Sequence, residues 1–113
     1  MTKLIGEQQL MRIFIGEGDR HGQRPLYEAL VELLRCEGVA GVTVVRGICG
    51  FGANRIFHTQ KLLDLSADLP IIVEAVDSPE AISAVMPQID AMMSGGMITL
   101  EKATVIRYSH KKP

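Results

Sequence analysis

Apolar and polar residues alternate along residues 9–16, QLMRIFIG, as is typical of a β-strand with both faces partly covered. One face carries Met11, Ile13 and Ile15, and the other carries Leu10, Arg12 and Phe14. Residues 1–8 are polar and unpatterned, which predicts a flexible lead-in. Apolar runs predict three further strands over residues 42–49, 71–76 and 97–108, the last one broken near Glu101 and Lys102.

Two segments between these strands have the 3.6-residue apolar spacing of amphipathic helices. The first begins at Pro25, has its apolar stripe at Leu26, Ala29, Leu30, Leu33 and Leu34, and ends at Gly38. The second begins with Ser78 as its cap and Pro79 in its first turn. Pro87 is expected to kink that helix, and Gly95 and Gly96 to end it.

The predicted order is strand, helix, strand, strand, helix, strand. Right-handed crossovers then place both helices on one face of a four-stranded antiparallel sheet, the ferredoxin-like α+β sandwich. The 113 residues suffice for one domain with one core, so we predict a single domain over residues 1–113 with flexible ends at 1–8 and 109–113.

The connection from Gly47 to Leu69 is unusual, because about 20 residues join two strands where a few are typical. Loops of this length are usually functional or disordered. Glycine leaves backbone N–H groups accessible to an anion, and arginine matches phosphate or carboxylate geometry. The leading candidates for anion contact are Arg46, Gly47, Gly50, Gly52 and Arg55. The alternative is that these glycines only form turns and the arginines are solvated.

Three other residues of this connection are candidate ligand contacts, and each has a structural alternative. Phe51 stacks on a nucleobase, packs across a subunit interface or anchors the loop. His58 is a hydrogen-bond donor sensitive to pH near neutrality, or it makes a structural hydrogen bond. Asn54 begins the middle of the connection, residues 54–65, where we expect a partner to bind.

Composition excludes several classes of function. The net charge of −1 and the 4 % aromatic content disfavour a nucleic-acid-binding surface. Neither a signal peptide nor an apolar run long enough to span a membrane is found, so we expect a cytoplasmic protein. Cys36 and Cys49 are expected to be reduced and mostly buried. The three histidines lack metal-ligand spacing, and no catalytic motif is present, so we predict no metal site and no catalytic residues.

Four segments in order, RIFIGE, PLYEAL, GVAGVTVVRGICGFGA and SADLPIIVEAVDS, resemble the domain-of-unknown-function-190 family of the PII-like superfamily. The resemblance extends from Gln9 to about Tyr108. It implies a homotrimer of ferredoxin-like subunits that binds small effectors, usually adenine nucleotides, in clefts between subunits. A long loop after the second strand then contacts a partner, often a membrane transporter.

The resemblance also places two segments. Residues 47–69 occupy the position of the signalling loop, and Gly95 and Gly96 occupy the position of a second nucleotide-contacting loop. The long loop has no Tyr, so the modification known for nitrogen-regulatory PII proteins has no acceptor in it. The second loop is short, which favours a mononucleotide or cyclic nucleotide over a triphosphate.

The sequence therefore predicts a PII-like regulatory protein with no required cofactor, whose effector is an adenine nucleotide (AMP, ADP, ATP or a cyclic nucleotide). Its target would be a transporter or an enzyme. One alternative is an enzyme that uses His58 or Glu17 in the same cleft. Another is a trimer that binds divalent metal and resembles the CutA proteins, which share this architecture.

Overall fold

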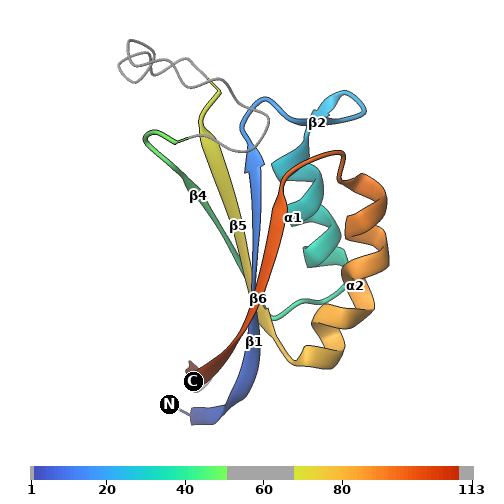
Figure 1. The fold of residues 1–113 in the computed structure, drawn as a ribbon. Helices are drawn as coiled ribbons and strands as arrows, with labels where there is room; N and C mark the ends of the chain where they lie inside the picture. The colour runs from blue at the N-terminus through green and yellow to red at the C-terminus, as the bar shows by residue number, and fades with distance from the viewer. Residues whose placement is uncertain (1, 51–67, 110–113) are drawn as a thin grey trace.

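The computed structural model describes residues 2–50 and 68–109 of the chain. A four-stranded antiparallel sheet has the order β4-β5-β1-β6, and two helices cover one of its faces (Figure 1). The strands of this sheet are β1 (Thr2–Gly16), β4 (Gly41–Arg46), β5 (Pro70–Asp77) and β6 (Met97–Ser109). The helices are α1 (Leu26–Cys36) and α2 (Pro79–Met92). A small hairpin of β2 (Arg20–His21) and β3 (Arg24–Pro25) precedes α1. The ferredoxin-like α+β prediction is confirmed.

The core lies between the sheet and the helices. Its fully buried members alternate along β1 and β5 and follow the apolar stripes of both helices, as the sequence patterns predict. The residues with at most 2 % of their surface exposed are Met11, Ile13, Leu26, Leu30, Leu34, Val73, Ala75, Ile82, Val85 and Ile89. Burial of these two helical stripes holds both helices on the same face of the sheet.

The ends of the helices follow local rules. The Ser78 hydroxyl accepts a hydrogen bond from the Ala81 N–H at 3.1 Å, which confirms it as the cap of α2. Gly38 has a φ of +78°, the left-handed conformation expected after α1. Pro25 lies just before α1 rather than in its first turn, and α2 continues through Pro87.

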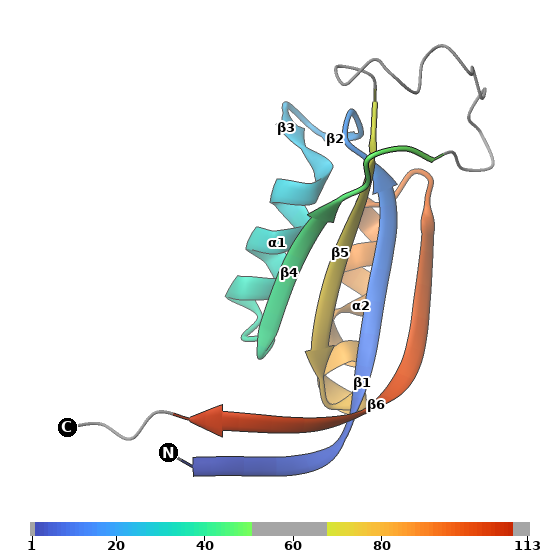
Figure 2. The same ribbon diagram turned by 90° about the vertical axis from the view of Figure 1, so that its left-hand side faces the viewer.

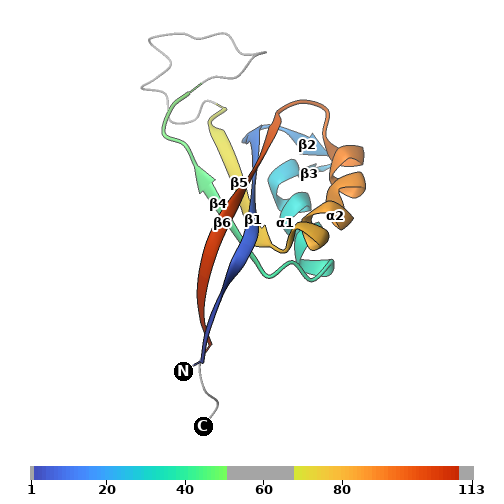
Figure 3. The same ribbon diagram turned by 60° about the horizontal axis from the view of Figure 1, so that its bottom comes forward.

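The central strand β1 is longer than predicted, because residues 2–8, expected to form a lead-in, pair with β6. β6 is also continuous, so the predicted break near Glu101 and Lys102 is wrong. Glu101 lies opposite Leu10 in an unbroken register, and its charge is paired with Arg12. β5 ends at Asp77, opposite Gln9. Beyond that point, β1 and β6 continue alone as a two-stranded arm that extends past the helices (Figure 3).

Candidate functional site

β4 ends at the predicted anion-binding residues. Gly47 donates its N–H to the carbonyl of Pro70, the first residue of β5, at 2.7 Å. A Cβ at Gly47 would lie 2.7 Å from Pro70 Cγ, so no larger residue fits there without a shift of the proline. Gly50 has a φ of +150° and lies near the same proline ring. These two glycines therefore have a structural reason to be glycine, and their backbones are fixed where the connection leaves the sheet.

Arg46, the last residue of β4, forms an ion pair with the Glu17 carboxylate. Its side chain is 59 % exposed, whereas that of Glu17 is 29 % exposed. Glu17 itself is held by its backbone, whose N–H donates to the Leu69 carbonyl at 2.8 Å. The guanidinium thus lies at the surface, within reach of a ligand, but it is already paired with an acidic group.

Gly95 and Gly96 form the turn between α2 and β6, at the same end of the sheet as Gly47. Gly96 has a φ of +101°, and a Cβ there would lie 2.5 Å from the Phe14 carbonyl oxygen. The two glycine segments flank opposite sides of the central strands, since β4 and β6 are the two edge strands. Three strand spacings, roughly 14 Å, separate those edges, so the segments share an end of the sheet without forming a common cradle.

The remaining predicted site residues lie outside the described residues: Phe51, Gly52, Asn54, Arg55 and His58.

A pocket that no sequence pattern indicated lies at the opposite end of the sheet. It forms where four strands become two, in the notch beside β1 and β6 just beyond the end of β5, and has a volume of about 330 Å³. Its wall includes the apolar side chains of Ile5, Val76 and Val105 and the polar residues Gln8, Asp77, Ser78 and Arg107. An apolar wall with one guanidinium suits a ligand that has both a flat apolar part and a negative charge. We refer to this feature as the notch pocket.

Asp77 holds the notch pocket in shape. Its two carboxylate oxygens accept hydrogen bonds from the N–H groups of Ala40 and Ser78, at 2.9 Å and 2.7 Å. These bonds tie the start of β4 and the start of α2 to the end of β5. Because both oxygens of the Asp77 carboxylate are bonded to the backbone, this carboxylate shapes the pocket wall. The guanidinium in the wall is that of Arg107.

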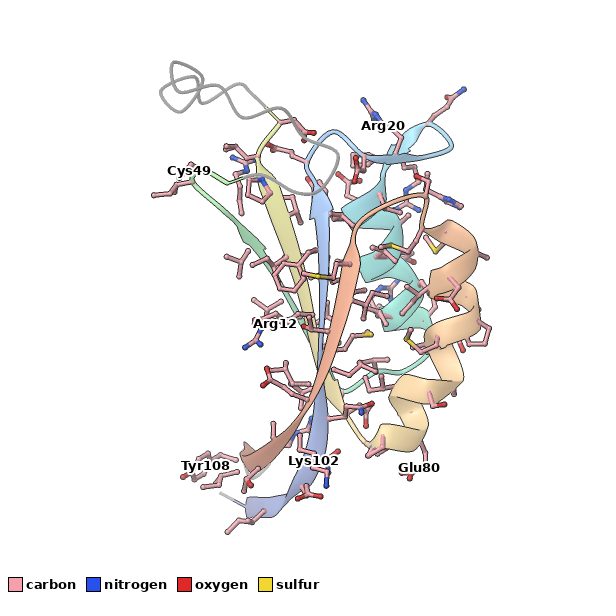
Figure 4. The ribbon with its side chains drawn as sticks, in the orientation of Figure 1. Arg12, Arg20, Cys49, Glu80, Lys102 and Tyr108 are labelled. Carbon is pink, nitrogen blue, oxygen red and sulfur yellow. The ribbon has the colours of Figure 1, made fainter. Side chains whose placement is uncertain are left out.

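The helices leave the other face of the sheet open (Figure 2). This face carries a charged cluster among apolar residues. Arg12 Nε lies 2.7 Å from a Glu74 oxygen, and its Nη1 contacts Glu101, so three adjacent strands are joined. The hydrogen bond with Glu74, followed by that with Glu101, raises the pKa of the Arg12 guanidinium. Figure 4 shows Arg12 pointing away from the helices. Apolar neighbours on this face are Leu10, Phe14, Val45, Ile72 and Met97.

Both cysteines are free and exposed, so the expectation that they are mostly buried is wrong. Cys36 is the last residue of α1, and Cys49 lies beyond the end of β4 (Figure 4). Within the described residues, no three His, Cys, Asp or Glu side chains gather in a way that would hold a metal ion. None of the helices in this part of the chain has the length and apolar character that a membrane crossing requires.

The fold matches solved structures of PII-like proteins. CPII from Thiomonas intermedia K12, solved with ADP and bicarbonate, has a TM-score of 0.59 and 19 % identity, covering 90 % of this chain and 91 % of that one. A protein of Thermus thermophilus described as PII-like signalling has a TM-score of 0.62 and 16 % identity, covering 89 % and 90 %. The fold is therefore the one seen in solved PII-like proteins.

Sequence comparison gives the family. The model of DUF190, described as "Uncharacterized ACR", matches residues 8–105, and the chain belongs to this family. A UPF0166 protein of Aquifex aeolicus is 35 % identical over 102 residues, covering 90 % of this chain and 96 % of that protein. A UPF0166 protein of Methanocaldococcus jannaschii is 31 % identical over 100 residues, covering 88 % and 92 %.

Proposed function

We propose that this protein is a PII-like regulatory protein, a homotrimer that binds an adenine nucleotide in clefts between its subunits. The notch pocket is the observation that carries the proposal. It offers an apolar wall for a base and a guanidinium for a phosphate, and Arg107 is the one cationic residue among the described residues that line it. A tight nucleotide site needs further donors, and a neighbouring subunit can supply them.

The donors predicted from the sequence lie at the other end of the sheet. β5 runs from Pro70, beside Gly47, to Asp77, in the wall of the notch pocket. Eight residues of extended chain place these two ends roughly 23 Å apart, too far for one small effector to contact both within a single chain. In a head-to-tail ring, however, one end of each subunit meets the opposite end of the next subunit. A rotation of about 120° between neighbours closes such a ring at three subunits. Each cleft would then combine Arg107 of one copy with Arg46 and Gly47 of its neighbour.

The open face of the sheet supports assembly. Three residues of this face are only partly covered within one chain: Leu10, Phe14 and Ile72. They belong to β1 and β5, whose other face is the most buried part of the sheet. Val45 and Met97 on the same face remain 43 % and 55 % exposed. Exposed apolar side chains gathered around an ion-pair cluster on one face are typical of a surface that contacts another molecule. Packing against further copies of the chain would bury it.

The solved relatives support an adenine nucleotide as the effector. CPII has been solved with ADP and bicarbonate, and also with ADP, AMP and acetate. We propose that the effector of this protein is likewise an adenine nucleotide, and that its binding is signalled to a transporter or enzyme through residues 47–69. The protein acts in this proposal as a regulator rather than as an enzyme. Gly50, Phe51, Gly52, Asn54, Arg55, His58, Gly95 and Gly96 are the further contact residues we propose.

A thermal-shift panel tests the effector. Adenosine, AMP, ADP, ATP and cyclic AMP are added separately to the purified protein, with divalent metals as a parallel series. A nucleotide at 100 times its dissociation constant adds about 2.7 kcal/mol of stability, which raises the melting temperature by several degrees. No shift with any nucleotide would contradict the proposal, and a shift with metal alone would favour the metal-binding alternative.

Mixed oligomers test the location of the cleft. Arg46→Ala and Arg107→Ala are expected to weaken nucleotide binding strongly when each is present in every subunit. If the two arginines serve one cleft from different copies, co-expression of the two variants restores about a quarter of the clefts in a random mixture. If both arginines serve a site within one chain, no mixture restores any site.

A further inference from the structure

The ion pair between Glu17 and Arg46 places an acidic group of the protein where the proposed effector's phosphate would bind. Only Nη2 of the guanidinium contacts Glu17 among the interactions of the described residues. A guanidinium has five N–H donors, so an anion can approach the others while Glu17 stays nearby. The phosphate would then either share Arg46 with a carboxylate or displace it.

The turn that carries Glu17 is held by hydrogen bonds from the backbone N–H groups of Glu17 and of the next residue. The Glu17 N–H donates to the Leu69 carbonyl at 2.8 Å, and the Gly18 N–H donates to Asp68 Oδ1 at 2.6 Å. Asp19 fixes the same turn, since its carboxylate accepts from the Gly16 N–H at 2.9 Å. The turn therefore keeps the Glu17 backbone beside Arg46, and its side chain, 29 % exposed, stays close enough to compete when an anion arrives.

We propose that Glu17 is a positioning residue that limits the charge selectivity of the effector site by competing with the effector's phosphate for Arg46. This inference rests on the proposed function, because it assumes that Arg46 contacts the effector. A neutral nucleoside has no group that competes with Glu17, and it gains nothing from Arg46. A terminal phosphate carries close to two negative charges near pH 7 and competes well with the single charge of a carboxylate. Arg46 therefore favours nucleotides over nucleosides, and Glu17 reduces this preference because it weakens the binding of each anionic nucleotide and leaves the binding of a nucleoside unchanged.

The test is a calorimetric titration of adenosine, AMP and ADP into the wild-type protein and four variants: Glu17→Gln, Arg46→Ala, the double variant, and Glu28→Gln. Glu28, in the first turn of α1, is exposed, and its substitution removes the same unit of charge away from Arg46. We expect Glu17→Gln to tighten the binding of AMP and ADP about two- to five-fold and to leave adenosine unchanged, since exposed ion pairs have effects of this size. Glu28→Gln is expected to change none of the three.

The gain from Glu17→Gln must also disappear when Arg46 is alanine, and it must shrink at high salt, which screens exposed charges. Equal changes for adenosine and AMP, or weaker AMP binding in Glu17→Gln, would overturn the inference, because they indicate that Glu17 only supports the turn. If Arg46→Ala binds AMP like the wild type, the inference fails while nucleotide binding stands. If the wild type binds no nucleotide, the proposed function fails and the inference fails with it.

Discussion

The two faces of the sheet differ in what covers them, although the same strands build both. On the helix-covered face, Met11, Ile13 and Val73 are completely buried within one chain. On the open face, Phe14 and Ile72 of the same strands are only partly covered and surround an ion-pair cluster centred on Arg12. The covered face accounts for the stability of the subunit. The open face leaves apolar side chains partly exposed around this cluster, which is why we assign it to assembly.

The largest effect is expected on the covered face. Leu30→Ala removes a side chain that is fully buried between α1 and the sheet, and it leaves a cavity. The free energy of unfolding should fall by about 2–5 kcal/mol, as measured by urea denaturation. A loss below about 1 kcal/mol would mean that this face does not form the core.

A substitution on the open face should weaken assembly and leave the fold of the subunit intact. Phe14→Ser is expected to abolish the proposed trimer while the separated subunit keeps its helical and strand content, measured by sedimentation and circular dichroism. The reason is that Phe14 lies on the face opposite the helices, paired with Ile72 and Met97 on its neighbouring strands. Val42→Ser, a partly buried site on the helix-covered face of β4, serves as the control and should leave the trimer intact. A Phe14→Ser protein that remains trimeric would contradict the assignment.

The charged cluster offers a smaller perturbation of the same face. Arg12→Met leaves the Glu74 and Glu101 carboxylates without their cation, and like charges then oppose close packing of the copies. The concentration at which the trimer dissociates should rise, and adding Glu101→Gln to the same protein should restore part of the loss. Sedimentation across a dilution series measures both changes. Unchanged dissociation would mean that the cluster lies outside the contact between copies.

The smallest effect is expected on the exposed side of α1, remote from both sheet faces. Hydrogen bonds from Arg35, and then from Cys36, lower the pKa of Glu32. A lowered folded-state pKa means that the associated stability is present above the ordinary glutamate range and is lost as the pH falls through the folded pKa. Carboxyl NMR titration should show Glu32 titrating below an ordinary glutamate, and Arg35→Met should move its pKa upward. An unchanged Glu32 pKa in that variant would contradict the role of Arg35.

Much of the fold could be predicted from the sequence, because the covered face leaves a local pattern. The alternation over residues 9–16 separated Met11 from Arg12 correctly, and Ser78 and Gly38 marked helix ends through backbone chemistry that is local to each. The beginning of β1 and the continuity of β6 were missed because these two segments pair with each other, and residues so far apart in the sequence leave no local pattern. Neither strand has a strongly apolar face in that region, and the arm becomes visible only in the register of the two strands, from Thr2 opposite Ser109 to Gln8 opposite Ala103.

The candidate site could be inferred from the sequence only in part, for a related reason. Gly47 and Arg46 are recognisable because glycine and arginine signal turns and anions by residue type. The notch pocket arises from a difference in strand length: β5 stops at Asp77 while β1 and β6 continue. A single valine, glutamine or arginine in those strands gives no indication of a pocket, so Arg107 could be recognised only after the strands were placed together.

Native mass spectrometry of the wild-type protein, with and without ADP, tests the central claim most directly, because it reports assembly and occupancy together. Our account predicts a particle of three 12.4 kDa chains that binds up to three ADP molecules. A monomer at micromolar concentration, or a trimer that retains no ADP when the nucleotide is in large excess, would contradict it.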